Sequence, residues 1–143
     1  MKDYRESLAA QAKTYLDANK AATALSAITV YRGLSTTELK HPSIIVHCPE
    51  ARPYSPGLGI WRVNLEATIL SSLTEGLSDT GVTHRARFAA LTALFDDESP
   101  STVTSGLTAA GVITTYGFEI EEMTGLKEDQ VLADTLRLAV FVG

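Results

Sequence analysis

The stretch IWRVNLEATIL, residues 60–70, decides the fold of this chain. Apolar side chains recur at every second position of it, namely Trp61, Val63, Leu65, Ala67 and Ile69. Strict alternation is typical of a β-strand with one buried face and one polar face. One-sided strands are common in antiparallel sheets, whereas the strands of parallel sheets are buried on both faces. The stretch therefore predicts a strand of an antiparallel sheet.

Three other segments have the composition of strands. Residues 43–48 form a β-branched run between two prolines, and residues 112–121 and 131–142 alternate apolar and polar side chains. A fourth, short strand is plausible at residues 28–31. The polar link 122–130 contains Gly125 and is predicted to be the long tip of a hairpin.

Apolar residues at helical spacing predict two main helices. The first covers about residues 3–18, and the second covers about residues 84–95 and takes Thr83 as its N-cap. Ser99 and Pro100 predict a short further helix through Leu107. Strands that cluster in pairs favour an α+β fold with a mainly antiparallel sheet of about four strands. We expect a single domain spanning residues 1–143.

Composition excludes several classes of protein. The only cysteine, Cys48, cannot form an intramolecular disulfide or a zinc site built on cysteines. A net charge of −5 excludes a globally basic nucleic-acid binder. The first twenty residues are charged throughout, which predicts no signal peptide, and no apolar run approaches the ~20 residues of a membrane span.

Charge is distributed unevenly along the chain. Residues 1–72 contain eight Lys and Arg against six Asp and Glu, whereas residues 73–143 contain four against eleven. No Lys or Arg occurs from Phe88 to Leu126. A surface of a single sign repels another polyanion, so this region is expected to repel nucleic acid.

No catalytic, metal or cofactor motif is complete. His41, His47 and Cys48 are close in sequence, but neighbours on a strand point to opposite faces, and His84 lies on the apolar stripe of its helix. Buried, hydrogen-bonded histidines are therefore expected. The triplet 79–81, Asp-Thr-Gly, resembles the catalytic triplet of retroviral-type aspartic proteases, although a turn before the helix is favoured. We predict no cofactor, no metal and no enzymatic activity.

The order of segments resembles a known family. A helix, a strand and a proline-rich loop precede GIWRVNLEA at residues 59–67. A loop, the helix at 84–94, a Glu-rich strand and the terminal LRLAV at 136–140 follow. This order resembles that of the small tail-terminator and head–tail completion proteins of tailed bacteriophages, and the resemblance covers most of the chain.

The resemblance implies a sheet backed by helices on one face and a ring of identical copies, typically a hexamer. Such a ring caps the tail tube, stops its growth and meets the head–tail connector, while DNA passes through without specific binding. The implied partners are other copies, the tail tube protein and the connector, with no membrane. The implied location is the neck of the virion, after synthesis in the host cytoplasm.

A closed ring needs two different complementary faces, which the basic first half and the acidic second half are able to supply. The candidate ring contacts are Arg62, Arg85, Arg87, Glu119 and Glu121. The candidate docking residues, in the loops 52–59, 74–81 and 122–130, are Arg52, Tyr54, Leu58, Asp79, Lys127 and Asp129. The alternatives are a head-completion, connector or tail tube protein, an aspartic protease using Asp79, and a small ligand-binding α+β domain.

Overall fold

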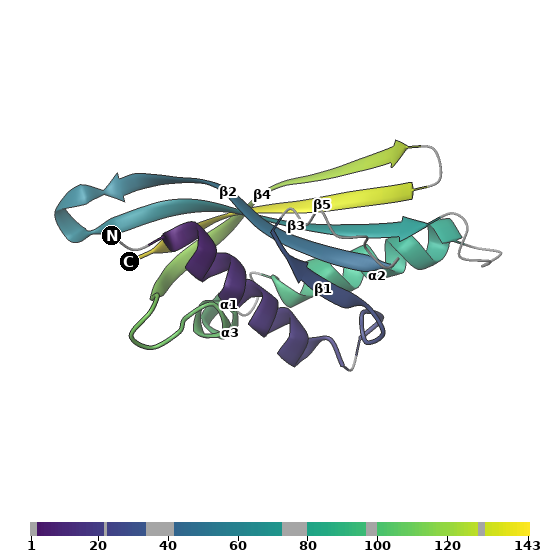
Figure 1. Cartoon of the computed structure of the whole chain (residues 1–143), viewed down its shortest axis with the longest axis horizontal. Helices are drawn as coiled ribbons and strands as arrows, with labels where there is room; N and C mark the ends of the chain where they lie inside the picture. The colour runs from purple at the N-terminus through teal and green to yellow at the C-terminus, as the bar shows by residue number, and fades with distance from the viewer. Residues whose placement is uncertain (1–2, 22, 34–41, 73–79, 97–99, 129–130) are drawn as a thin grey trace.

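A five-stranded mixed sheet organises the chain (Figure 1). The computed structural model describes residues 3–21, 23–33, 42–72, 80–96, 100–128 and 131–143. The strands are β1 (Thr29–Arg32), β2 (Ser43–Ser55), β3 (Ile60–Ser72), β4 (Thr115–Glu128) and β5 (Val131–Val142), in the spatial order β1-β2-β3-β5-β4. The pairing is antiparallel throughout, except that β1 runs parallel to β2.

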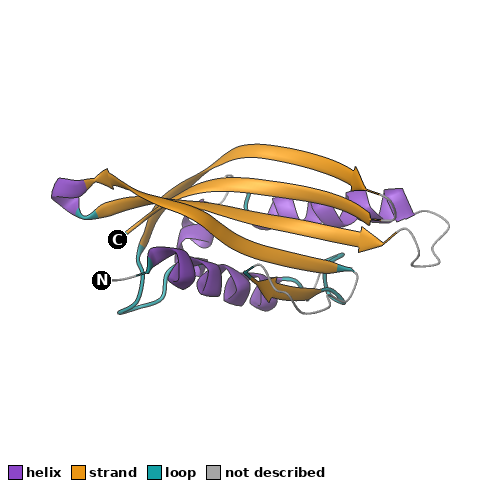
Figure 2. Ribbon diagram, turned by 45° about the horizontal axis from the view of Figure 1, so that its top comes forward, coloured by secondary structure: helices purple, strands orange, loops and turns teal. Residues whose placement is uncertain are grey.

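Among the described residues, three helices lie on one face of this sheet and none lies on the other, which is called the open face below (Figures 1 and 2). They are α1 (Tyr4–Asn19), α2 (Thr80–Leu94) and α3 (Pro100–Gly106). The predicted α+β class is confirmed. The sheet has one strand more than the predicted four, because the short segment before residue 33 pairs with β2, and that pair makes the sheet mixed.

The core lies between β3 and the helices. The predicted alternation along β3 is confirmed, since Val63, Leu65, Ala67 and Ile69 are fully buried. Leu8 and Leu16 of α1 belong to the same buried cluster as these side chains, as do Leu91 of α2 and Phe95 just beyond it. Burying one such side chain contributes roughly 1.5–3 kcal/mol, so this layer dominates the stability of the fold.

Two predicted strand limits are wrong. The strand predicted to end at Cys48 continues to Ser55, because a bulge between His47 and Glu50 accommodates Pro49, which has no N–H to donate to the ladder. The strand predicted over 112–121 begins at Thr115 and continues to Glu128, so the polar residues from 122 to 128 are not a loop. They pair with β5 along its length, and this strand pairing outweighs their polar composition, which is typical of a loop.

The predicted N-cap of the second helix is also wrong, because α2 begins at Thr80 and Thr83 lies inside it. The first helix matches its predicted limits to within a residue. There the Asp3 carboxylate accepts hydrogen bonds from the backbone N–H groups of Arg5 and Glu6.

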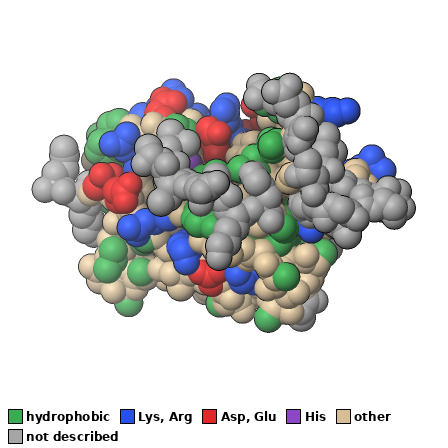
Figure 3. Space-filling view, turned by 45° about the vertical axis from the view of Figure 1, so that its right-hand side comes forward, with side chains coloured by type: hydrophobic (Ala, Val, Ile, Leu, Met, Phe, Trp, Pro, Cys, Tyr) green, Lys and Arg blue, Asp and Glu red, His purple; other side chains and the backbone are tan. Residues whose placement is uncertain are grey.

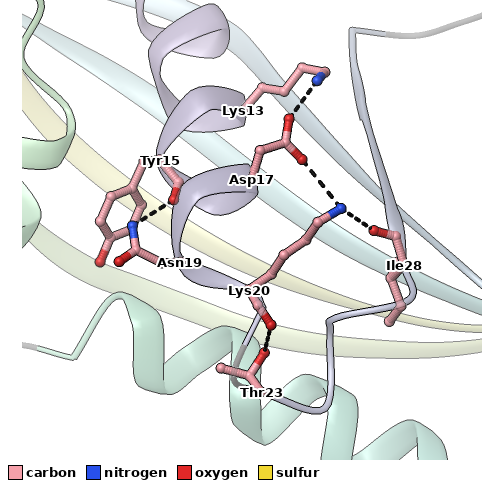
Figure 4. Close-up of polar contacts among 7 residues, drawn as sticks. All are labelled: Lys13, Tyr15, Asp17, Asn19, Lys20, Thr23 and Ile28. Atoms are coloured by element: carbon pink, nitrogen blue, oxygen red, sulfur yellow. Dashed lines mark hydrogen bonds and ion pairs between the residues drawn. The ribbon is translucent and has the colours of Figure 1, made fainter.

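The end of α1 is held by a group of polar contacts (Figure 4). Asp17 Oδ2 lies 2.6 Å from Lys13 Nζ, and Asp17 Oδ1 lies 3.3 Å from Lys20 Nζ. The ammonium of Lys20 also donates to the carbonyl of Ile28 at 2.6 Å, just before β1. Although burial alone would raise the pKa of Asp17, the hydrogen bonds from Lys13 and Lys20 hold it below its usual value. These contacts tie α1 to the edge strand β1.

Replacing Asp17 with asparagine is expected to lower the free energy of unfolding by about 0.5–1 kcal/mol at neutral pH, because exposed ion pairs contribute about that much. The folded pKa is lowered, so this contribution is complete above the unfolded pKa of the carboxyl and is lost as the pH falls through the folded pKa. Urea unfolding at neutral pH and at about pH 2.5 measures it, with the exposed Glu119→Gln as the control. An equal loss at both pH values would contradict the assignment.

Candidate functional site

Ion pairs cross the open face of the sheet from strand to strand. Arg62 Nη2 of β3 lies 2.5 Å from Glu121 Oε2 of β4. Arg137 of β5 contacts Glu66 of β3 at 3.2 Å and Glu122 of β4 at 3.5 Å. The pair Arg62–Glu121 joins a base of the first half to an acid of the second half. Arg137 belongs to the second half and pairs with one acid from each half. The two halves therefore neutralise each other in part within one chain.

Surface charge follows the same mixed pattern. Figure 3 shows acidic and basic side chains interspersed over the face that it views. The reason is topological, because β3 from the first half lies beside β5 from the second half. The uneven charge along the sequence therefore does not translate directly into two separate faces.

The structure divides the five candidate ring contacts between two sides of the sheet. Arg62 and Glu121 pair with each other on the open face. Glu119 is exposed opposite Ala139 of β5. Arg85 and Arg87 belong to α2 on the covered side, where Arg85 is exposed and Arg87 donates to Ser71 Oγ at 3.0 Å.

The hairpin tip, residues 52–60, comprises the end of β2, a short turn and the first residue of β3, whereas the sequence predicts a loop over 52–59. Arg52 and Tyr54 belong to β2 rather than to a loop, and only Leu58 lies in the connection, a 3₁₀ turn at Pro56–Leu58. Gly59 closes the turn with a φ of +68°, a conformation that favours glycine. The Tyr54 ring packs on Phe141 of β5 with centroids 4.7 Å apart, yet both Tyr54 and Leu58 stay exposed.

Of the three remaining candidate docking residues, the structure describes only Lys127. Lys127 belongs to β4, paired opposite Leu132, and not to a hairpin tip as predicted. Asp79 and Asp129 lie outside the described residues. The two residues after Asp79, Thr80 and Gly81, form the start of α2.

An apolar groove lies between α2 and β4, hereafter the α2–β4 groove, and the sequence analysis does not predict it. Its volume is about 590 Å³. It is lined by Arg85, Phe88, Ala89, Thr92, Ala93, Asp96, Ile120 and Met123. Simple alternation places residues 120 and 122 on one face, but a bulge between Ile120 and Glu122 changes the phase of β4. Met123 therefore faces the helices together with Ile120, opposite Leu136 and Leu138 respectively.

A buried chain of hydrogen bonds joins α2 to β3 and β5. Arg87 donates to Ser71 Oγ, Ser71 Oγ lies 2.8 Å from His84 Nδ1, and His84 Nε2 lies 2.8 Å from Asp134 Oδ2. Both ring nitrogens of His84 are therefore engaged, Nδ1 with the Ser71 hydroxyl and Nε2 with the Asp134 carboxylate. A Cβ on Gly125, opposite Asp134, would overlap Asp134 Oδ1, so a larger residue there would make the carboxylate shift.

This chain of serine, histidine and aspartate has the residue types of a hydrolase triad but not its access. Ser71 is fully buried, so no substrate carbonyl reaches its Oγ, which already accepts a hydrogen bond from Arg87. The three side chains therefore hold α2 against the sheet. The expectation of a buried, hydrogen-bonded His84 is confirmed.

The other histidines and the cysteine do not converge. His47 pairs opposite Glu66 on the open face, whereas Cys48 belongs to the core on the other side. Burial raises the pKa of the Cys48 thiol to about 12, so it stays protonated at neutral pH. His41 lies outside the described residues. Within the described part of the chain, no three His, Cys, Asp or Glu side chains come together as metal ligands.

Replacing Ser71 with alanine is expected to lower the free energy of unfolding by about 1–3 kcal/mol, because it leaves the buried Nδ1 of His84 without its hydrogen-bond partner. Urea unfolding measures the loss. Thr14→Ala is the control, since it removes an exposed hydroxyl that bonds only within α1. Equal stabilities of the two variants would show that the buried chain contributes nothing.

Comparisons with known proteins do not place the chain in a family. No protein-family model matches it, and no curated protein matches it. Among the described residues, no helix has both the length and the apolar character needed to cross a membrane.

Proposed function

We propose that this chain is a non-enzymatic virion assembly protein of a tailed bacteriophage, a tail terminator. Identical copies form a ring, typically of six, that caps the tail tube and joins it to the head connector. The order of sequence segments supports this proposal, and so does the placement of the helices on a single face of the sheet (Figure 2).

One observation carries the proposal furthest: eight large apolar side chains of the described residues are exposed, and four of them lie in two separate pairs. Tyr54 and Leu58 are exposed at the hairpin tip, and Ile120 and Met123 are exposed in the α2–β4 groove. Exposed apolar clusters mark contact surfaces, and a closed ring requires two different surfaces on each copy. The chain carries such a pair of surfaces.

The open face of the sheet supports passage of DNA without retention. Five carboxylates on this face, those of Glu50, Glu66, Glu119, Glu121 and Glu122, outnumber the three guanidinium groups of Arg52, Arg62 and Arg137. All three guanidinium groups are already paired with these carboxylates. Phosphates are retained by unpaired cations, so a surface of this kind lets DNA slide.

Mass measurement in solution and electron microscopy of the purified protein test the proposal. The expected result is a closed ring that binds one end of tubes assembled from the tube protein of the same genome. Open stacks of the chain alone would identify a tail tube protein instead. A monomer or twofold dimer that binds no tube would overturn the assembly function altogether.

A further inference from the structure

We infer that the hairpin tip of the free chain inserts into the surface of a bilayer of neutral lipids. The contact is interfacial, since the tip enters the layer between headgroups and acyl chains and does not cross the membrane. The inference goes beyond the proposed function and does not depend on it, because it concerns the chain before assembly, when no other copy covers the tip. It departs from the expectation of no membrane contact, which came with the family resemblance.

The end of the hairpin is free of charge. No Asp, Glu, Lys or Arg occurs in residues 53–61, PYSPGLGIW. Leu58 in the turn is 76% exposed and Tyr54 is 62% exposed, the two highest values among the exposed large hydrophobic residues. A continuous uncharged run with exposed apolar side chains marks a surface that leaves water when it binds.

The apolar side chains of this run surround the end of the hairpin. Tyr54 stacks on Phe141 on the open face, whereas Trp61 lies near Tyr4 of α1 on the helix-covered face. Leu58 lies between them in the 3₁₀ turn, and the hairpin projects beyond the other elements at the left of Figures 1 and 2. Because binding to a bilayer grows with the apolar area that enters it, a projection that is apolar on both faces favours lipid over a one-sided contact with a protein.

The backbone of the tip is suited to an apolar medium, in which N–H groups without a partner are costly. Pro53 and Pro56 have no N–H group to satisfy. The N–H of Gly59 donates to the carbonyl of Pro56 at 3.2 Å, and Ser55 is still paired with Ile60 of β3. The tip therefore enters the interface with few unpaired donors.

The position of the charged residues sets the depth of insertion. Arg52 and Arg62 lie opposite each other where the uncharged run begins and ends. At about 3.3 Å per residue, the strand from Arg52 to Ser55 places the turn roughly 10 Å beyond this pair. Interfacial elements bury their apolar side chains by roughly 5–10 Å. The uncharged part is therefore long enough for such a contact, with the arginines at the level of the headgroups.

Neutral lipids suffice because both arginines are already paired within the chain. Arg52 lies 3.1 Å from Glu50, and Arg62 is held by Glu121. Attraction to anionic lipids is therefore not expected to contribute to binding. This property separates insertion from adsorption through cations, which requires anionic lipid and weakens with salt.

A fluorescent label at the tip tests the inference. Gly57→Cys carries nitrobenzoxadiazole, a dye that brightens when it leaves water, and Gly81→Cys at the start of α2 is the matched control. A Cβ at either glycine meets no atom within 4 Å, so both substitutions are sterically free. Cys48 does not compete for the dye, because it is buried and its pKa is raised to about 12.

The probe membranes are vesicles of phosphatidylcholine, with and without phosphatidylglycerol. The expected result is a brighter dye at position 57 and an unchanged dye at position 81. The response is expected to be equal for both kinds of vesicle and to persist in about 1 M salt, which screens charges beyond roughly 3 Å.

Flotation of unlabelled variants with the same vesicles gives an independent readout. Leu58→Ser is expected to weaken binding about 10- to 100-fold, the contribution of one leucine side chain that leaves water. Leu126→Ser is the control, because Leu126 has an exposure of 58% but lies at the opposite end of the sheet. No loss of binding is expected for it.

Three results would overturn insertion into lipid. A dye at position 57 that does not respond at about 1 mM lipid, well above the ~0.1 mM at which a single acyl chain binds, would leave the tip as a contact for a protein. Equal losses from Leu58→Ser and Leu126→Ser would show non-specific adherence. Binding to phosphatidylglycerol vesicles alone, lost in salt, would show adsorption through cations. Ring formation is measured without lipid, so none of these results decides the proposed function.

Discussion

Replacing Phe95 with alanine is expected to lower the free energy of unfolding by about 3–5 kcal/mol, the largest loss from a single truncation that we predict. Phe95 is fully buried directly after α2. Its ring lies 5.5 Å from that of Tyr15, so it joins α2 to α1. Truncation removes a buried aromatic side chain and leaves a cavity between two helices, and both effects lower stability.

Urea unfolding at a fixed protein concentration measures this loss as a lower midpoint with an unchanged slope. Phe141→Ala is the matched control, because Phe141 lies half-buried on the open face against Tyr54. A smaller loss is expected there. If the two truncations cost the same, the helix layer does not form the core that its burial indicates.

The parts of the fold that the sequence predicts are those in which local pattern and tertiary environment agree. Residues 60–70 alternate because β3 has one buried face, and residues 131–142 alternate for the same reason in β5. The stripe of His84, Leu91 and Phe95 is buried against the sheet. In these segments the apolar residues recur with the same spacing as the positions that face the core.

The parts that the sequence missed depend on bulges. Pro49 indicates the end of a strand, yet the bulge beside it lets β2 continue to Ser55 and so creates the hairpin tip. A second bulge brings Ile120 and Met123 to the same face and forms one wall of the groove. A bulge is decided by the partner strand, which a single sequence does not show.

The chain of hydrogen bonds around His84 is likewise only partly predictable from the sequence. A buried histidine at position 84 was predicted from its place on an apolar stripe. Its partners, Ser71 and Asp134, are 13 and 50 residues away in the sequence. The one local signal is an aspartate in the apolar phase of residues 131–142, because a carboxylate on the core-facing side of a strand requires a donor.

Replacing Gly106 with alanine is expected to lower the free energy of unfolding by about 2–3 kcal/mol, as overpacking does in a filled core. Gly106 ends α3, where alanine would otherwise be favoured by about 1 kcal/mol from helix propensity. A Cβ at this position would overlap the Tyr15 ring and lie 2.6 Å from its Cε1. Tyr15 cannot move away cheaply, because it stacks on Phe95 and its hydroxyl donates to the carbonyl of Leu94.

A double-mutant cycle with Tyr15→Ala isolates the steric contribution. Without the ring, Gly106→Ala is expected to change sign and to stabilise the protein by up to about 1 kcal/mol through helix propensity. If Gly106→Ala destabilises the protein equally with and without the Tyr15 ring, overlap with that ring is not the cause. Since Tyr15 contacts both α2 and α3, an inverted sign would show that these elements pack through one aromatic ring of α1. That packing positions α2, and with it the wall of the α2–β4 groove.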